Sequence, residues 1–471
     1  MCLDAAGYQT RRGDIKRVNG KGEIMTFETK GKENNGAIYG RRSDWQDLYS
    51  IAKKYYEALL ADPGNAQFHL TDPRGASDKS GRTFNNPYQY FFEQMHMDDA
   101  IYADESIYEY PMQQGGGNDG RPYSFGRPSS GGSKAAYPCK SYGQGRINPA
   151  YFYGVFDPND MRRDVSITMT GSNGKGVEKL IPFVPNSKAE GGGLTLNKWD
   201  ENRQANPWVA AQRKSGINGP YMRMSEVYLG YAEVCAALGD VVTGKQYLKT
   251  VRERSFPQGL ANTDAFIASF GNDLVRAIIE ERGFEYAGEG DRRWTLIRSG
   301  YLPEDIKRIK DMTKAMMDGL ATKGYYEFEN GNIISAYIWT KLVDAKTIYG
   351  HRLTAQCPTD KVNDPVLYPG WRGQKDNWEE MGLNYGSSTP ATNLAIKGLF
   401  EIVSEEEAAS LESQGYAKVN WGIDLVDYRD EYDKYLFWDY DYVSAPIYLW
   451  PFTPNVMAAG GFTNGYGFKQ E

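Results

Sequence analysis

The sequence predicts a mainly α-helical protein, in which tetratricopeptide-like helix pairs form an α-α superhelix that carries a loop-rich C-terminal subdomain. Apolar residues recur at helical spacing within 43–64 and again within 221–254. Other stretches are rich in Gly, Pro, Ser and aromatic residues, a composition typical of loops. Helix pairs and long loops in one chain therefore favour a repeat scaffold with loop-rich additions.

Four parts are expected along the chain. Residues 1–110 are the N-terminal helical part of the repeat scaffold, and 111–220 are a loop-rich insertion with short strands. Residues 221–300 contain the tetratricopeptide-like helix pairs, and 301–471 form the loop-rich, aromatic C-terminal subdomain.

The first amphipathic helix is predicted between Ser43 and Gly64. Ser43 followed three residues later by Gln46 fits a capping box, and Pro63 with Gly64 ends the helix. The predicted apolar stripe consists of Trp45, Leu48, Tyr49, Ala52, Tyr56 and Leu59.

A pair of short antiparallel helices is predicted over 221–254. Gly239 is placed to stop the first helix, and Thr243 with Gln246 predicts a capping box for the second. The apolar stripe of the first helix consists of Met224, Val227, Tyr228, Tyr231, Cys235 and Leu238. This pair resembles a tetratricopeptide hairpin, although the consensus of roughly 34 residues is absent.

The composition argues against several functions. The net charge is −7, whereas a protein that binds duplex nucleic acid usually needs a dominant basic face. The four Cys and three His are scattered, so neither a close-spaced zinc site nor another metal or cofactor is expected. The segment "GSNGKG" lacks the spacing of a phosphate-binding loop. No apolar run approaches the roughly 18 residues that span a membrane.

Charged residues crowd the segment 281–300, directly after an apolar helix. If that helix begins near Asp273, Glu281 and Glu285 fall on its apolar face and point into the protein. A buried carboxylate needs a cation or several hydrogen-bond donors. We therefore predict a structural ion-pair network made of Glu281, Glu285, Glu289, Arg292, Arg293 and Arg298, in which the arginines return the matching charge.

Two functional interpretations compete with this network. The two carboxylates could be the acid and base of a glycoside hydrolase, or they could hold a metal. Neighbouring arginines oppose the raised pKa that a catalytic acid needs. We therefore assign no catalytic residue and expect no enzyme activity.

The same segments resemble the SusD/RagB family of outer-membrane nutrient-uptake lipoproteins. The family has an R-x-x-E-x-x-L-x-x-A-E helix, which Arg223, Glu226, Leu229, Ala232 and Glu233 match. Its V-R-x-R segment is matched by Val251, Arg252 and Arg254. A third element is matched by Glu281, Arg282, Glu285, Glu289, Gly290, Arg292, Leu296, Arg298 and Gly300. Tyr286 and Thr295 depart from this third pattern, in which the family usually has Phe and Asp.

The resemblance implies a non-catalytic glycan-binding protein at the outer membrane, facing the cell surface. Such a protein caps a SusC-like TonB-dependent transporter and delivers glycan to it. Against the family pattern the chain looks shortened at its N-terminus. Membrane association would then be only through an N-terminal lipid anchor absent from this chain, although Cys2 is an alternative lipidation position.

Aromatic residues in the loops are the expected glycan contacts, because a ring face can stack on the C–H face of a sugar. The candidate rings are Trp208, Trp371, Trp378, Tyr142 and Tyr385, and the candidate polar partners are Arg372, Asn377 and Asn384. Two alternatives stay open: a helical-repeat scaffold that binds only peptides or proteins, and a glycoside hydrolase.

Overall fold

The computed structural model describes most of the scaffold and part of the loops. The described residues are 1–12, 16–30, 37–72, 86–95, 105–113, 115–116, 120–132, 140–173, 178–186, 189–199, 212–214, 216–344, 392–436 and 452–461. All structural statements below concern these residues.

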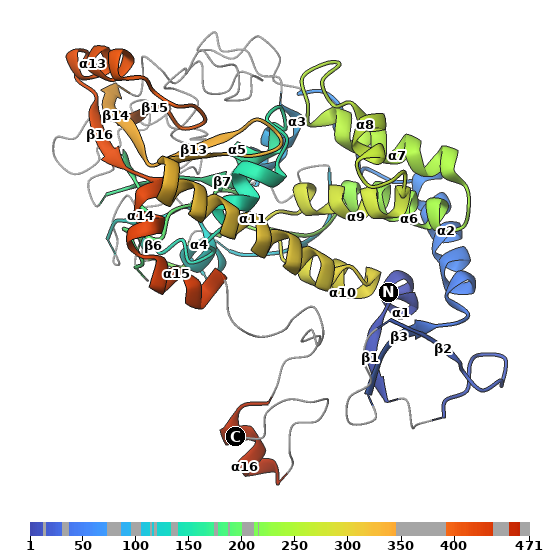
Figure 1. Ribbon diagram of the computed structural model, residues 1–471. Helices are drawn as coiled ribbons and strands as arrows, with labels where there is room; N and C mark the ends of the chain where they lie inside the picture. Colours follow the sequence, from blue (N-terminus) through green and yellow to red (C-terminus); the bar gives the residue numbers. More distant parts are fainter. Residues whose placement is uncertain are drawn as a thin grey trace.

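Helix pairs form one end of the molecule. Figure 1 shows α2 (Trp45–Ala61), α6 (Met224–Ala237) and α7 (Val241–Arg254) beside α8 (Thr263–Ala268) and α9 (Leu274–Glu285). The core shared by α6, α7, α8 and α9 is formed by Leu229, Ala232, Leu248, Val251, Ile267, Leu274, Ala277, Ile278 and Tyr286. The helix α2 packs on α6 in a separate cluster that includes Tyr49, Ala52 and Tyr231. The predicted mainly helical fold with a loop-rich part is therefore confirmed.

The predicted helix ends are confirmed in part. Gly239 follows α6 with a φ of +92°, a conformation that glycine adopts without strain. The cap residues differ from the prediction: Asp44, not Ser43, precedes α2, and Asp240 caps α7 by accepting a hydrogen bond from Thr243 N (3.2 Å). Asp and Ser are both good cap residues, so the choice depends on where the chain turns.

A small sheet and three further helices border the helix pairs. The strand order is β1–β3–β2, formed by β1 (Gln9–Arg12), β3 (Ala37–Arg42) and β2 (Phe27–Thr29). The short helix α1 (Cys2–Ala6) precedes this sheet, and α10 (Arg292–Ser299) leads into the long helix α11 (Leu302–Lys323). In Figure 1 the sheet lies beyond α10, next to the N-terminus.

A second helical and stranded layer forms the opposite end. It holds a sheet of order β15–β14–β16, made of β15 (Thr392–Lys397), β14 (Tyr337–Asp344) and β16 (Ala417–Asn420). The other elements here are β12 (Tyr325–Glu327), β13 (Ile333–Ser335), α13 (Glu405–Ser413), α14 (Gly422–Asp427) and α15 (Arg429–Leu436). The short helix α16 (Pro454–Gly460) lies apart from this layer (Figure 1). The long helix α11 runs between the two ends (Figure 1).

Short strands and turns fill the centre. These elements are α3 (Pro87–Gln94), β4 (Ser106–Tyr110), α4 (Gly120–Phe125), β5 (Ser129–Ser130), β6 (Lys140–Ser141), the π-helical turn η1 (Tyr151–Val155), α5 (Arg162–Ser166), β7 (Ile167–Thr168), β8 (Thr170–Ser172), β9 (Glu178–Leu180), β10 (Thr195–Leu196) and β11 (Gly219–Arg223). Three sheets result, with orders β6–β5–β8–β9, β10–β7 and β11–β4. Among all the described helices, none is both long and apolar enough to span a bilayer.

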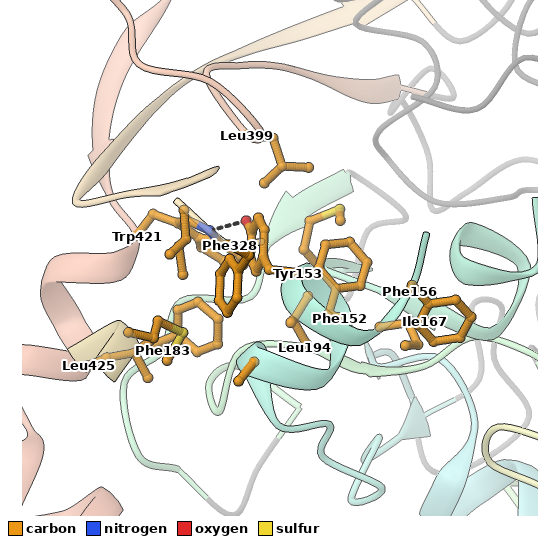
Figure 2. Close-up of a cluster of buried hydrophobic side chains, with 14 of the residues drawn as sticks. Phe152, Tyr153, Phe156, Ile167, Phe183, Leu194, Phe328, Leu399, Trp421 and Leu425 are labelled. Carbon is orange, nitrogen blue, oxygen red and sulfur yellow. Dashed lines mark hydrogen bonds between the residues drawn. The ribbon is translucent and has the colours of Figure 1, made fainter. Parts of the chain in front are cut away.

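The largest apolar core joins the central segments to the second layer. Figure 2 shows Trp421 and Tyr153 at its middle, where the indole N–H of Trp421 donates a hydrogen bond to Tyr153 Oη (2.8 Å). The rings of Phe183 and Trp421 lie 4.3 Å apart. Because a buried Trp or Tyr needs a partner for its polar atom, this bond lets both rings enter the core without an unsatisfied group.

A glycine substitution tests how tightly this core is packed. Gly193 has a φ of +71°, and a Cβ there would lie 2.0 Å from the Phe183 ring. We expect Gly193→Ala to lower the free energy of unfolding by about 2–5 kcal/mol, because it adds a steric clash to backbone strain. Urea denaturation measures the change.

Gly331→Ala is the matched control. Its φ is +85°, but nothing lies within 4 Å of the position a Cβ would take. It should therefore lose only the strain contribution, about 1–2 kcal/mol. Equal losses for the two variants would contradict the tight packing against Phe183.

Candidate functional site

Two carboxylates of α9 lie at the centre of a buried ionic cluster. Glu281 and Glu285 are one helical turn apart, and both are fully buried. Glu281 pairs with Arg162 Nη1 (2.7 Å) and Arg252 Nη1 (3.0 Å). We call the group of Glu281, Glu285 and the charged side chains that contact them the ionic core.

Three guanidinium groups surround Glu285. Arg254 Nη2 donates to it at 2.6 Å, Arg223 Nη1 at 2.7 Å and Arg162 Nη1 at 3.2 Å. Burial alone would raise the pKa of this carboxyl, but Arg254, Arg223 and Arg162 outweigh burial and hold the pKa far below its usual value. The carboxylate is therefore ionised, and both of its oxygens accept hydrogen bonds from arginines.

The arginines that pair with Glu281 and Glu285 correct the predicted partners. Arg292 pairs instead with Glu280 (2.7 Å) and Asp305, and Arg298 pairs with Glu233. Arg293 lies half-buried on α10. Sequence proximity misled the prediction, because α10 turns its basic residues toward other faces of α9 and toward α6.

The remaining predicted member of the network, Glu289, does receive buried cations. Arg223 Nη2 lies 2.9 Å from Glu289 Oε1, and Lys198 Nζ lies 2.6 Å from the same atom. Lys198 is fully buried, and burial, only partly offset by Glu289, lowers its pKa to about 8. Lys198 was not singled out from the sequence, and nothing in its local pattern indicated burial.

This arrangement does not suit acid–base chemistry at Glu281 and Glu285. A glycosidase acid needs a raised pKa and access to substrate, whereas both carboxylates are enclosed and paired with arginines. Among the described residues, no group of three or more His, Cys, Asp or Glu is arranged to hold a metal ion.

The ionic core anchors a β-ribbon that carries exposed tyrosines. Glu105 is fully buried directly before β4, and it accepts from Arg254 Nη1 (2.6 Å) and Arg223 Nη1 (3.3 Å). Arg223 is itself the last residue of β11, which pairs with β4. The base of the ribbon is thus fixed by the same arginines that neutralise Glu285.

Three tyrosines project from this ribbon into solvent. Tyr108 and Tyr110 alternate along β4 and are 60% and 56% exposed, so they share one face. Tyr221 occupies an irregularity in β11 and is 79% exposed. Its ring stands at 89° to that of Tyr108, with centroids 5.6 Å apart. We call Tyr108, Tyr110 and Tyr221 the tyrosine ridge.

A cation lies at one end of the tyrosine ridge. The Arg121 guanidinium carbon is 5.7 Å from the Tyr110 ring centroid. Gly219 pairs with Tyr110, and a Cβ at Gly219 would come within 1.1 Å of Arg121 Nη1. Glycine is therefore required at this position for Arg121 to lie across the ribbon.

The tyrosine ridge was not predicted from the sequence. The alternation in "SIYEY" was a usable signal, because it places Tyr108 and Tyr110 on one face of a strand. The third ring comes from a residue more than a hundred positions later, and only the pairing of β4 with β11 brings it close.

Of the predicted glycan contacts, Tyr142 alone belongs to the described residues. Its half-buried ring meets the Tyr123 ring edge-on at 5.1 Å, and Lys140 Nζ lies 5.2 Å from its centroid. Tyr123 belongs to α4, the helix that also supplies Arg121. The other candidates, Trp208, Trp371, Trp378, Tyr385, Arg372, Asn377 and Asn384, lie outside the described residues.

A cleft of about 770 Å³ opens elsewhere on the helical end. It lies between the C-terminal half of α7, the turn into α8, and a wall that includes Leu70 and Pro87. Arg254 also lines this cleft, so one side chain reaches both the cleft and the ionic core.

Removing one charge from the ionic core should destabilise the protein. We expect Glu285→Gln to lower the free energy of unfolding by about 3–5 kcal/mol, because it leaves buried guanidinium groups short of a counter-charge. Chemical denaturation gives the value. Glu253→Gln breaks a half-exposed pair with Lys249 (3.5 Å) and should change stability by about 0.5 kcal/mol or less. A small effect at Glu285 would contradict the role of the ionic core.

Stability should also fall in acid. Burial raises the pKa of Glu280, but Arg292, Arg308 and Arg276 more than reverse this and set the pKa at about 2, below the ordinary 4.5. Its contribution is therefore complete above about pH 4.5 and is lost as the pH falls toward about 2. We expect Glu280→Gln to reduce the loss of unfolding free energy over this window.

The free energy of unfolding is compared between about pH 4.5 and about pH 2. Glu412→Gln, on the exposed side of α13, is the control for this comparison. It removes the same charge from the surface, and the decrease in unfolding free energy in acid should stay as in the wild type. If Glu280→Gln loses as much unfolding free energy in acid as the wild type does, the contacts of Glu280 with Arg292, Arg308 and Arg276 do not stabilise the folded chain.

Comparison with known proteins connects this structure to a family. The family model for the SusD family matches residues 68–451. SusD-like protein P25 of Formosa agariphila is 28% identical over 160 residues, which are 34% of this chain and 26% of that protein. The chain thus spans about a quarter of that relative's length.

Solved structures show similar partial matches. A SusD homologue from Bacteroides thetaiotaomicron aligns with a TM-score of 0.40 and 17% identity, over 57% of this chain and 52% of that one. Surface glycan-binding protein A from the same species, solved with laminarihexaose, aligns with a TM-score of 0.37 and 18% identity, over 55% and 52%. The chain spans about half of these two structures. Because the family model matches most of the sequence, this chain belongs to the SusD family.

Proposed function

We propose that this chain binds glycans without chemical conversion, and that the tyrosine ridge is a glycan-binding surface. The observation that carries this proposal is the set of three tyrosines, each more than half exposed, on a ribbon fixed to the ionic core. Contiguous exposed patches of apolar side chains often mark interaction sites, and the Tyr108 and Tyr221 rings are in contact with each other.

The shape of the tyrosine ridge suits a sugar chain. A pyranose ring has a C–H face that packs on an aromatic ring and hydroxyl groups at its rim that form hydrogen bonds. The Tyr108 and Tyr221 rings are nearly perpendicular and offer two such surfaces. Arg121, near Tyr110, can donate to a hydroxyl or ring oxygen. Because the base is rigid, little ordering is needed when a ligand binds.

Family membership supports the wider role. We infer that the protein acts at the outer membrane, faces the cell surface, and caps a SusC-like TonB-dependent transporter to which it passes glycan. Surface glycan-binding protein A of Bacteroides thetaiotaomicron was solved with laminarihexaose, which supports the glycan-binding part of this proposal. Trp371 and Trp378, which lie outside the described residues, stay proposed as glycan contacts in addition to those of the tyrosine ridge.

Calorimetry with neutral hexaoses of glucose, mannose, galactose and xylose tests the tyrosine ridge. We expect Tyr108→Ala/Tyr221→Ala to weaken binding of the hexaose that binds the wild type by about tenfold or more, because each aromatic contact contributes about 0.5–1.5 kcal/mol. The melting temperature should stay near the wild-type value, because both side chains are largely exposed.

Tyr55→Ala is the matched control, since Tyr55 on α2 is 69% exposed and outside the tyrosine ridge. Its affinity should equal that of the wild type. If Tyr108→Ala/Tyr221→Ala binds normally while Trp371→Ala/Trp378→Ala does not, the site belongs to the predicted loop and not to the tyrosine ridge. Binding of peptides in place of every hexaose would reject glycan recognition.

A further inference from the structure

The cleft beside α7 and α8 has the features of a second ligand site. Its volume of about 770 Å³ falls within the range of small-molecule sites, which is about 300–1,000 Å³. Apolar side chains, among them Met161 and Pro87, line part of it, and polar side chains such as Gln258 and Asn262 line the rest. Mixed walls of this kind suit a ligand with both C–H surface and hydroxyl groups.

Two buried polar atoms of cleft-lining residues have no hydrogen-bond partner among the described residues. One is the hydroxyl of Thr263, a residue that is 6% exposed, and the other is Nε of Arg254, which is 4% exposed. A buried polar atom without a partner is unfavourable by roughly 1–3 kcal/mol. Such groups persist where a ligand or water completes them. Together they offer one N–H donor and one hydroxyl that can donate or accept.

The backbone next to Thr263 supports this interpretation. Asn262 adopts a left-handed conformation with a φ of +39°, which is uncommon for a residue other than glycine. Strained backbone of this kind concentrates at functional sites. Here it sets the direction in which the chain enters α8, and thus the position of Thr263 in the cleft wall.

The charged residues around the cleft compensate one another. Lys245 pairs with Asp264 (2.5 Å), and Lys249 pairs with Glu253 (3.5 Å). Arg254 is already neutralised by Glu105 and Glu285. A charged ligand would have to displace one of these partners, whereas a neutral ligand would not. The charge pattern therefore favours a neutral, hydrogen-bonding molecule.

We propose that this cleft is a second binding site, which takes one or two units of a neutral polyhydroxylated ligand such as an oligosaccharide. A ligand hydroxyl accepts from Arg254 Nε, and a neighbouring one bonds the Thr263 hydroxyl. The ligand class follows the proposed function, but the site is separate from the tyrosine ridge. Because Arg254 also holds Glu105 at the base of β4, the two sites share one structural support.

Thr263→Val gives a sharp test, because it removes the hydroxyl and keeps the shape. Loss of an unpartnered hydroxyl should leave the melting temperature of the ligand-free protein unchanged or higher. Binding of the same neutral hexaoses should become about five- to tenfold weaker, as expected for one lost hydrogen bond. Measuring hexaose binding by Thr263→Val in the Tyr108→Ala/Tyr221→Ala background separates binding in the cleft from binding at the tyrosine ridge. Thr263→Ser should restore the affinity.

Thr250→Val is the control, because this α7 hydroxyl already donates to Gln246 O (3.0 Å) away from the cleft. If the ridge variant loses all hexaose binding and Thr263→Val binds as the wild type does, the cleft proposal is overturned while glycan binding at the tyrosine ridge stands. If Thr263→Val weakens binding and the ridge variant does not, the cleft is supported and the ridge is rejected. If no hexaose binds the wild type, both fail.

Discussion

The buried pairing of glutamates with arginines is the constraint on which the rest of this structure depends. Glu281 and Glu285 lie on one face of α9, and Arg162, Arg223, Arg252 and Arg254 reach them from α5, β11 and α7. The guanidinium groups from these elements must lie within about 3 Å of the two carboxylates for the buried charges to be compensated. The ionic core therefore sets the relative positions of elements that are far apart in the chain.

Such a core defines geometry more surely than it adds stability. Desolvation of each ion is expensive, and apolar residues of the same volume can stabilise a core as well. What an apolar core lacks is direction, because guanidinium and carboxylate groups accept only certain approach geometries. In this chain the fixed geometry of the ionic core also orients the β4–β11 ribbon. Glu105 and Arg223 hold the base of the ribbon, so the tyrosine ridge stands on a rigid support.

This arrangement separates charge from recognition. The acidic groups most suggestive of catalysis in the sequence are enclosed and neutralised, while the exposed side chains of the tyrosine ridge are uncharged. The proposed glycan binding needs a preformed surface, and exposed rings on a ribbon fixed to the ionic core supply one. In the proposed second site, the cleft lined by Arg254 and Thr263, a neutral ligand would form hydrogen bonds with polar atoms that have no partner among the described residues.

Local patterns in the sequence determined the helices, because apolar spacing and stop residues such as Gly239 act within a few positions. The family motifs in the chain also contained three of the four arginines of the ionic core, Arg223, Arg252 and Arg254, but not Arg162. The pairing could not be predicted, because Arg292 and Arg298 were nearer to Glu281 along the chain but not in space. Likewise the sequence placed Tyr108 and Tyr110 on one strand, but only the pairing of β4 with β11 added Tyr221. Spacing along a helix or strand is fixed by local backbone geometry, whereas contacts between distant segments depend on how the whole chain packs.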